Sequence, residues 1–391
     1  MKRIAIVTRK MIIGGIEKSL LGLLEEINFD EYEVDLYLEE EGGDLSPYLD
    51  KRVNLIYIYN DYISITKKIL HELRDFNIKN CISLIQTGLI LKYGVNDYLK
   101  YKARLRLTKG FHKDYDLAIA YHNPISFTTM FCIEKIKAKK KIMWVHSDIN
   151  EYLDIVDRNK DYYDQYDQIF CVSERCKSTF TTRYESLADR CQVYYNHIKK
   201  SHVLSGENLQ YKEEIWNSHK FRILTVSRLS NEKGVNLIPE VALLLKEEGI
   251  DFEWIVVGEG SEYAPLLKKI NDYKVHDYVH LAGKQLNPYI YMVGCDIYIQ
   301  PSLYEAYGLT IAEAKCFGLP IIATKTQGAL EQIQDRFTGR LCEVNSESIY
   351  QVLKELISNP GEQQLYRDNL KKEEINTSNE INKLYRCIEE M

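Results

Sequence analysis

Short apolar runs rich in β-branched residues alternate along this chain with longer mixed segments, and this alternation constrains the fold most. The runs are nearly continuous in apolar residues, which is typical of parallel strands covered on both faces. In the first half the predicted strands span 4–8, 34–38, 53–58, 117–121, 141–146, 168–173 and 193–195. In the second half they span 221–227, 252–257, 279–282, 297–300, 320–324 and 341–344, with helical patterns at 234–247, 261–272, 307–317 and 346–358. The pattern predicts an α/β protein with two Rossmann-like domains, each built on a parallel sheet.

A length of 391 residues fits two domains, and a polar stretch marks their expected boundary. Residues 197–220 contain the run Gly206-Glu207-Asn208 just before a predicted strand. We place the first domain at 1–200, the second at 201–365 and a charged, helix-prone tail at 366–391, which either returns to the first domain or stays on the second. Ligands of open α/β sheets bind beyond the carboxyl ends of the strands, so we expect the chemistry in a cleft between the two sheets.

Composition excludes several other classes of protein. Hydrophobic residues make up 45% and charged residues 28%, which argues against collagen-like, low-complexity and wholly disordered chains. The net charge of −6 argues against a surface devoted to nucleic acid, so no nucleic-acid partner is expected. Nine cysteines without a C-x-x-C pair indicate buried thiols in a reducing compartment. The N-terminal apolar stretch is too short for a signal peptide and no run is long enough to span a membrane, so we expect a cytoplasmic protein.

The most informative segment is Pro301–Ala314, where a predicted strand runs into a loop holding Glu305. The chain then enters a helix whose first turn contains Gly308, Leu309 and Thr310, and backbone N–H groups at a helix start can bind phosphate. Eight residues of helix would separate the Cα atoms of Glu305 and Glu313 by about 12 Å. That separation suits two ends of an extended ligand better than the roughly 5–9.5 Å carboxyl pair of a glycosidase. An ordinary surface glutamate and a helix-face glutamate are the alternative.

Two cations and two glycine pairs also follow predicted strands. Arg228 and Lys233 come after the strand 221–227 and suit a diphosphate, although solvated surface cations are the alternative. Gly14-Gly15 and Gly258-x-Gly260 lack the further residues of a dinucleotide fingerprint or a Walker loop, so each pair alone predicts a turn.

In their order and separations, these motifs resemble the family-4 retaining glycosyltransferases of the GT-B fold, as found in bacterial capsule and exopolysaccharide synthesis. The resemblance runs from residue 1 to about residue 360 and rests on Glu305-x7-Glu313, Arg228-x4-Lys233-Gly234, Gly258-Glu259-Gly260 and Gly14-Gly15.

The resemblance implies that the second domain holds a nucleotide-sugar donor, for which UDP is expected because it is the commonest nucleotide in such enzymes. Arg228 and Lys233 would neutralise the diphosphate, and Glu313 would accept hydrogen bonds from the ribose. Glu305 and the backbone of the following helix start would hold the sugar and its phosphate. The implied catalytic residues are Arg228, Lys233, Glu305 and His146, and the implied donor-binding residues are Gly15, Lys284, Tyr307, Gly308, Leu309, Thr310 and Glu313.

The same resemblance implies transfer with retention and without a metal or other cofactor, the leaving phosphate taking the acceptor proton. Asp114-Tyr115-Asp116 matches the D-x-D pattern of metal-dependent transferases, but it precedes an apolar run and predicts a strand-entry turn. His146 at a predicted strand end matches a family histidine beside the transferred sugar, although a lone histidine is more often structural.

Basic residues gather in 92–113 and 135–141, which fits an anionic membrane surface, with a solvated basic face as the alternative. The expected acceptor is a glycan or a lipid-linked glycan precursor of cell-surface polysaccharide synthesis, and the expected location is the cytoplasm or the inner face of the membrane. Two alternatives stay open: a nucleotide-sugar epimerase or phosphorylase on the same fold, and a non-catalytic subunit that binds a partner transferase or a glycan.

Overall fold

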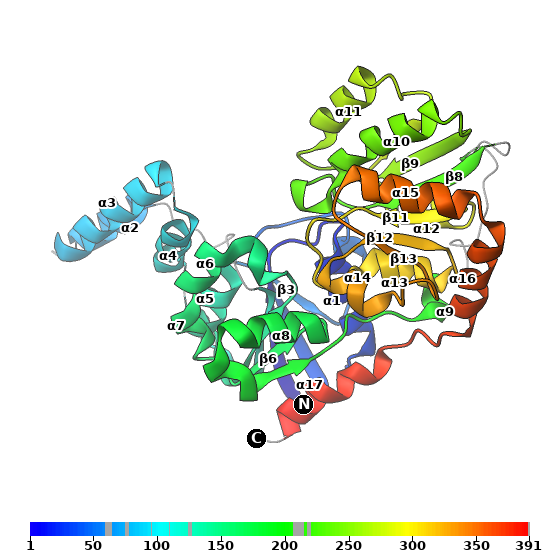
Figure 1. Cartoon of the computed structure of the whole chain (residues 1–391). Coiled ribbons are helices and arrows are strands. Elements are labelled where there is room, and N and C mark those ends of the chain that lie inside the picture. Colours follow the sequence, from blue (N-terminus) through cyan, green and yellow to red (C-terminus); the bar gives the residue numbers. More distant parts are fainter. Residues whose placement is uncertain are drawn as a thin grey trace. The chain divides into compact units, whose positions relative to one another are not determined.

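The computed structural model describes residues 1–58, 65–74, 78–94, 96–108, 110–123, 127–205, 215–216 and 220–389. The chain divides into two compact units (Figure 1). Unit 1 comprises Met1–Val172, Lys177–Tyr194 and Ile381–Met391, and unit 2 comprises Ser173–Cys176 and Tyr195–Glu380. Gly206, Glu207 and Asn208 of the predicted boundary, and Lys109 of the basic stretch, lie outside the described residues. The predicted domain limits therefore stay predictions.

Unit 1 is built on a seven-stranded parallel sheet in the order β3-β2-β1-β4-β5-β6-β7. Its strands are β1 (Lys2–Thr8), β2 (Tyr32–Leu38), β3 (Asn54–Tyr57), β4 (Asp114–Asn123), β5 (Lys137–Val145), β6 (Gln168–Cys171) and β7 (Cys191–Val193). Its helices are α1 (Gly15–Glu26), α2 (Ile65–Arg74), α3 (Ile78–Tyr93), α4 (Asp97–Leu107), α5 (Phe127–Lys135), α6 (Leu153–Arg158), α7 (Lys160–Tyr163), α8 (Glu174–Arg183, which starts in unit 2) and α17 (Ile381–Glu389). Short 3-10 turns lie at Ser46–Tyr48, Ile149–Tyr152 and Glu185–Arg190.

Unit 2 repeats this plan with a six-stranded parallel sheet in the order β10-β9-β8-β11-β12-β13. Its strands are β8 (Phe221–Val226), β9 (Phe252–Val257), β10 (Val279–Gly283), β11 (Ile297–Gln300), β12 (Ile321–Thr324) and β13 (Arg340–Cys342). Its helices are α9 (Lys200–Val203), α10 (Ile238–Glu247), α11 (Tyr263–Asp272), α12 (Tyr289–Met292), α13 (Leu309–Cys316), α14 (Gln327–Gln332), α15 (Ser346–Ile357) and α16 (Pro360–Lys372). Short 3-10 turns lie at Asn231–Lys233, Val235–Leu237 and Ser378–Glu380.

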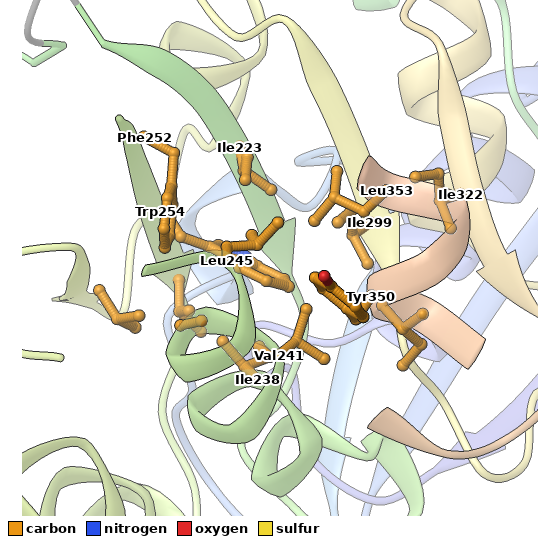
Figure 2. Packing of buried hydrophobic residues seen from close by; sticks show 14 of the residues in the cluster. Ile223, Ile238, Val241, Leu245, Phe252, Trp254, Ile299, Ile322, Tyr350 and Leu353 are labelled. Atoms are coloured by element: carbon orange, nitrogen blue, oxygen red, sulfur yellow. The ribbon is translucent and has the colours of Figure 1, made fainter. Parts of the chain in front are cut away.

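Both sheets confirm the predicted fold class, and every predicted strand overlaps an observed one. The central strands are buried because helices cover both faces of a parallel sheet, which is why their sequences read as continuous apolar runs. In unit 2, α10 and α15 cover one face with a core that includes Leu245, Trp254 and Tyr350 (Figure 2). The indole N–H of Trp254 donates to the Thr225 hydroxyl at 3.1 Å, so this buried polar group is satisfied.

Asp114, Tyr115 and Asp116 are the first three residues of β4, which corrects the prediction of a turn before the strand. Each carboxylate forms an ion pair with a lysine of β5: Asp114 with Lys137 at 2.8 Å and Asp116 with Lys139 at 2.7 Å. The D-x-D pattern therefore ties neighbouring strands together. Among the described residues, no cluster of three or more His, Cys, Asp or Glu could hold a metal ion.

Two further observations bear on the sequence predictions. Eight of the nine cysteines are buried, as predicted, and Cys387 is half-buried. Within the part of the chain that the structure describes, no helix is long and apolar enough to cross a membrane.

Candidate functional site

The strand order of unit 2 places the candidate site at the topological switch point, where successive strands begin to be added on the opposite side of the sheet. β8 and β11 are neighbours, yet the chain continues from β8 toward β9 on one side and from β11 toward β12 on the other. Loops that leave two such strands diverge, and in open α/β sheets ligands bind between them. The two loops here, 227–234 and 301–308, carry Arg228, Lys233 and Glu305, which the sequence singled out.

Close backbone contact joins these two loops, and glycine makes that contact feasible. Gly234 has a φ of +62°, and a Cβ at this position would lie 1.9 Å from the carbonyl oxygen of Pro301. Neither the backbone conformation nor the space therefore suits a residue with a side chain. Gly258 plays the same part after β9, where a Cβ would lie 1.8 Å from the carbonyl oxygen of Ser227. The glycines of both motifs thus hold neighbouring loops together.

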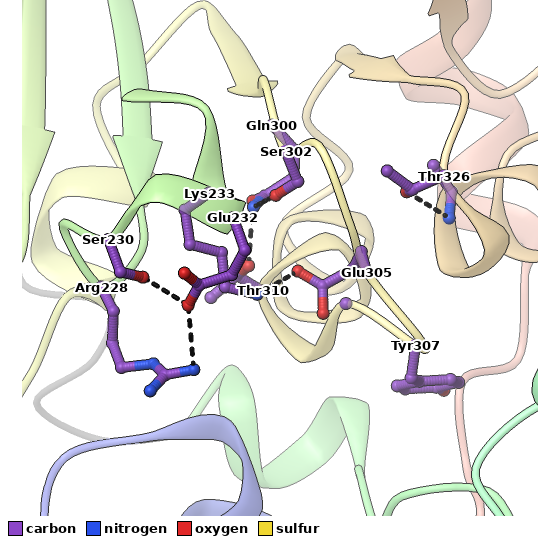
Figure 3. Close-up of polar contacts among 12 residues, drawn as sticks. Arg228, Ser230, Glu232, Lys233, Gln300, Ser302, Glu305, Tyr307, Thr310 and Thr326 are labelled. Carbon is purple, nitrogen blue, oxygen red and sulfur yellow. Dashed lines mark hydrogen bonds and ion pairs between the residues drawn. The ribbon is translucent and has the colours of Figure 1, made fainter. Parts of the chain in front are cut away.

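Glu232 organises the loop after β8 from its centre. Its carboxylate accepts hydrogen bonds from the Ser230 hydroxyl and, at 3.3 Å, from the Arg228 guanidinium (Figure 3). Burial opposes ionisation of this carboxyl, but the Ser230 hydroxyl and the nearby cations outweigh it and hold the pKa of Glu232 below its ordinary value. Its backbone carbonyl accepts the N–H groups of Leu303 and Tyr304 at 2.8 and 3.2 Å. Glu232 therefore positions Arg228 and also ties the two loops together.

Lys233 and Glu305 form the ion pair at the centre of the site. The Lys233 Nζ lies 2.6 Å from Glu305 Oε2, and the two side chains are only 16% and 14% exposed. Arg228 is the outer cation, with 56% of its side chain exposed. The structure thus brings together Arg228, Lys233 and Glu305 (Figure 3). Each cation pairs with a carboxylate, Lys233 with Glu305 and Arg228 with Glu232, and Arg228 is the more exposed of the two.

A buried hydrogen-bond chain fixes the end of β11 just before the loop. The Gln300 side-chain carbonyl accepts from the hydroxyls of Tyr298 and Thr310, at 2.5 and 3.1 Å, and its amide donates to Ser302 at 2.8 Å. Because Thr310 lies in the first turn of α13, this chain sets the position of the helix start relative to the strand. The sequence predicted that Thr310 binds the nucleotide-sugar donor. In the structure its hydroxyl donates to the Gln300 side chain.

The other side of the loop is held by α14. The N–H of Gly328 donates to the Glu305 carbonyl at 2.8 Å, and the Gln332 amide donates to the carbonyls of Tyr307 and Gly308. Tyr307 is buried, and burial raises the pKa of its phenol. These hydrogen bonds fix the turn from Glu305 to Gly308. They thereby fix the position of the first turn of α13, whose backbone N–H groups can bind a phosphate.

Glu313 lies on the buried face of α13 and accepts a hydrogen bond from the Tyr289 hydroxyl at 2.8 Å. Burial, followed by the charge of Glu313, raises the pKa of Tyr289, so the phenol keeps its proton and donates. Leu309 begins the same helix. Lys284 is exposed directly after β10, next to Gly283.

Two predicted site residues belong to unit 1. Gly15 is the first residue of α1, and its Cβ position is open, whereas a Cβ on Gly14 would meet the Glu17 carboxylate at 2.3 Å. His146 directly follows β5, with its ring 4.6 Å from that of Tyr121 and stacked on Trp144. Its Nε2 is buried without a hydrogen-bond partner among the described residues. Burial, followed by the charge of His122, lowers the pKa of His146 well below its ordinary value, so the ring is neutral at pH 7.

Sequence reasoning missed Glu232 and Gln300. A polar residue that ends an otherwise apolar strand was the signal for Gln300. For Glu232, the only signal was a carboxylate between two cations that were expected to act together.

Comparison with known proteins finds similarity over the part of the chain that carries this site. Residues 208–373 match the family described as Glycosyl transferases group 1. The N-acetyl-alpha-D-glucosaminyl L-malate synthase of Bacillus anthracis is 31% identical over 182 residues, which are 44% of this chain and 47% of that protein. The amylovoran biosynthesis glycosyltransferase AmsK of Erwinia amylovora is 34% identical over 128 residues, or 31% of each chain. The chain thus spans about half the length, or less, of these curated relatives.

Solved structures match over the whole chain. HepE of Anabaena in complex with UDP-glucose superposes with a TM-score of 0.74 at 14% identity, covering 100% of both chains. WaaG, a glycosyltransferase involved in lipopolysaccharide biosynthesis, superposes with a TM-score of 0.64 at 15% identity, covering 98% of this chain and 99% of that one. At these identities the likeness shows the fold, which is the GT-B arrangement of two Rossmann-like units.

Proposed function

We propose that this chain, whose residues 208–373 match the group 1 glycosyl transferases, is a member of that family. We further propose that it transfers a sugar with retention from a UDP-sugar to a glycan or lipid-linked glycan precursor. One observation carries the proposal: the Lys233–Glu305 ion pair, at 2.6 Å, lies at the topological switch point between β8 and β11 and beside the start of α13. That place combines a fixed cation, an outer arginine and backbone N–H groups, which is what a diphosphate needs.

The proposed chemistry follows from charge. When the bond between the sugar and the phosphate breaks, negative charge grows on the leaving diphosphate and positive character grows at the anomeric carbon. Lys233 and Arg228 stabilise the diphosphate, and because Glu305 and Glu232 already hold them in place, little reorganisation is needed. Glu305 also offers a carboxylate to the hydroxyls of the sugar. The acceptor hydroxyl forms the new bond to the anomeric carbon, and its proton passes to the leaving phosphate.

The remaining roles are proposals of the same kind. Glu313, oriented by Tyr289, accepts hydrogen bonds from the ribose hydroxyls, and Lys284 lies beside the base. The backbone at Tyr307, Gly308, Leu309 and Thr310 binds the distal phosphate. From unit 1, Gly15 offers a backbone N–H at the start of α1, and His146 acts beside the sugar as a neutral hydrogen-bonding ring.

The choice of UDP is supported by a structural neighbour, since Anabaena HepE is known in complex with UDP-glucose. The choice of acceptor is supported by relatives, since AmsK is named for amylovoran biosynthesis. For a lipid-linked acceptor, the enzyme is proposed to work at the inner face of the membrane. Of the basic residues offered for that contact, Lys113 pairs with Glu33 and Asp35, and Lys137 and Lys139 pair with aspartates, so 135–141 is the weaker of the two segments.

A thermal-shift panel of UDP, GDP, ADP and their sugars tests the donor proposal. A ligand at 100 times its dissociation constant stabilises the fold by about 2.7 kcal/mol, so UDP compounds should raise the melting temperature selectively. Glu313→Ala should weaken this shift, whereas Glu347→Ala, on an exposed turn of α15, should keep it. A shift with none of the nucleotides would favour a non-catalytic subunit. Turnover of donor without acceptor would favour an epimerase, and a requirement for inorganic phosphate would favour a phosphorylase.

A further inference from the structure

An uncovered apolar stripe runs along α3 in unit 1. Its side chains recur at helical spacing on one face and are each between 51% and 68% exposed: Ile78, Ile82, Ile85, Leu89 and Tyr93. The neighbouring helix α2 adds Leu70 and Leu73, which are 57% and 52% exposed. Scattered exposed leucines are ordinary, but a continuous stripe of this kind marks a surface that contacts something apolar.

The stripe lies on a face that stays exposed in the described part of the chain. α3 packs against α2 and α4, and Figure 1 shows α2 and α3 side by side. Two hydrogen bonds join α3 to α2 through residues outside the stripe: the Asn80 amide donates to Glu72 at 2.9 Å, and the Cys81 thiol donates to the Ile69 carbonyl at 3.8 Å. Cys81 and Thr87 are buried, whereas the stripe residues are exposed. The helices α2 and α3 therefore pack against each other, and the apolar stripe of α3 stays exposed to solvent.

The helices that carry and adjoin this apolar face are rich in cations. Residues 65–107 contain nine Lys or Arg and only three Asp or Glu, in a chain whose net charge is −6. Arg74, Lys79, Lys92 and Arg106 are exposed on the three helices, and Lys92 lies 5.1 Å from the ring centre of Tyr93. An exposed apolar helix face within a cation-rich segment is the pattern of a helix that lies in the headgroup region of an anionic bilayer.

We propose that α2 and α3 dock the protein on an anionic lipid surface, with the α3 stripe entering the headgroup boundary and the cations of residues 65–107 binding lipid phosphates. The positive charge of residues 65–107 argues against a second copy of the chain covering the stripe. Pairing two stripes would bring two cation-rich segments together, and these would repel each other. The evidence for the lipid contact comes from unit 1 alone. Its role in reaching a lipid-linked acceptor rests on the proposed function. The proposal moves the membrane contact away from 135–141, where lysines are paired with aspartates.

Vesicle flotation tests this proposal with the full chain. Wild type should float with vesicles of phosphatidylglycerol and phosphatidylcholine, less so at high salt, and should not float with phosphatidylcholine alone. The variant Ile82→Ser/Ile85→Ser/Leu89→Ser should bind the anionic vesicles at least about tenfold more weakly. The matched control Leu267→Ser/Val344→Ser/Leu365→Ser removes three exposed apolar side chains from unit 2 and should float like wild type.

The thermal shift with UDP separates this proposal from the donor proposal. Both triple variants should keep the wild-type shift, because neither set of substitutions touches the loops at 227–234 and 301–308. Wild-type flotation of the α3 variant, or failure of wild type to float while the UDP shift persists, would overturn the lipid proposal and leave the donor proposal standing. A wild-type dimer that the α3 variant converts to a monomer would also overturn it, since a second copy would then cover the stripe. Flotation without any UDP shift would contradict only the donor proposal.

Discussion

The ion pair between Lys233 and Glu305 shows how this chain places charge before a ligand arrives. Glu305 fixes the lysine Nζ at 2.6 Å, and Glu232 fixes the Arg228 guanidinium at 3.3 Å, so each cation has its own carboxylate. The two carboxylates lower the cost of keeping two cations close together. Such preorganisation matters most at a site where negative charge grows during the reaction.

Lys233→Ala should lower kcat by about 10²–10³-fold, because the growing charge on the diphosphate loses its fixed partner. Steady-state kinetics with a UDP-sugar and an acceptor would measure the loss. Lys269→Ala removes a lysine from the exposed side of α11, and its kcat should match that of wild type. Near-normal turnover by the Lys233 variant would remove this lysine from the diphosphate.

Glu39, directly after β2, gives a prediction about pH. Its side chain is buried, and Oε1 lacks a hydrogen-bond partner among the described residues. Burial raises the pKa of this carboxyl to about 7, against the opposing pull of the Arg9 and Arg104 charges. Since the folded state binds this proton more tightly than the unfolded state does, the stabilisation is complete below the unfolded pKa. It is lost as the pH rises through about 7.

Glu39→Gln should remove this pH dependence, which amounts to about 3 kcal/mol between the two limits. Urea unfolding at several values from about pH 5 to about pH 8 would measure the free energy of unfolding for both proteins. Glu40→Gln changes the exposed neighbouring carboxylate and should keep the wild-type slope. If the Glu39 variant kept the slope as well, another group would be responsible for it.

At the scale of elements, the loops after β8 and β11 depend on Gly234. Gly234→Ala would place a Cβ 1.9 Å from the Pro301 carbonyl oxygen, so the two loops must separate. Gly249→Ala is the matched control, because Gly249 has a similar φ of +73° but nothing within 4 Å of its Cβ position. The control should cost about 1 kcal/mol through backbone strain alone. The Gly234 variant should cost at least about 2 kcal/mol more and also weaken UDP binding.

Equilibrium unfolding and a UDP titration of both variants would test this. Equal losses of stability would show that only the backbone conformation matters at Gly234. A stability loss without weaker UDP binding would show that the contact between the loops does not shape the donor site.

The elements also show how far the sequence could predict this structure. The strands were predictable because both faces of a parallel strand are buried, which leaves a continuous apolar signature. The glycines and charges of 227–234 and 301–314 were predictable as motifs. The helices α2, α3 and α4 were not assigned. For α3 the reason is that an apolar stripe lies on its exposed side, whereas the periodicity argument expects the apolar side of a helix to be buried. The role of Glu232 was not predictable, because it depends on how two distant loops meet.

At the scale of the whole molecule, segments of the two units alternate along the chain. The last helix, α17, belongs to unit 1, although the chain before it, from Tyr195 to Glu380, belongs to unit 2. Tyr385 stacks on Tyr32 at 4.9 Å, accepts the Asn28 N–H at 2.9 Å and donates to the Glu26 carbonyl at 3.1 Å. Unit 1 therefore includes a helix that follows unit 2 in the sequence.

Truncation after Glu380 should destabilise unit 1 by about 5 kcal/mol or more, because the buried side chains Ile381, Leu384 and Ile388 would be lost. Hydrogen exchange should then quicken in β1, β2 and α1, which surround the vacated site, and stay slow in β8 and β9. Leu384→Ala should reproduce this pattern at about 2–5 kcal/mol, whereas Leu365→Ala, on the exposed face of α16, should leave exchange unchanged. Faster exchange in both sheets would mean that the two units unfold as one. The stability of the donor site would then depend on the nine residues of α17 as well as on its own loops.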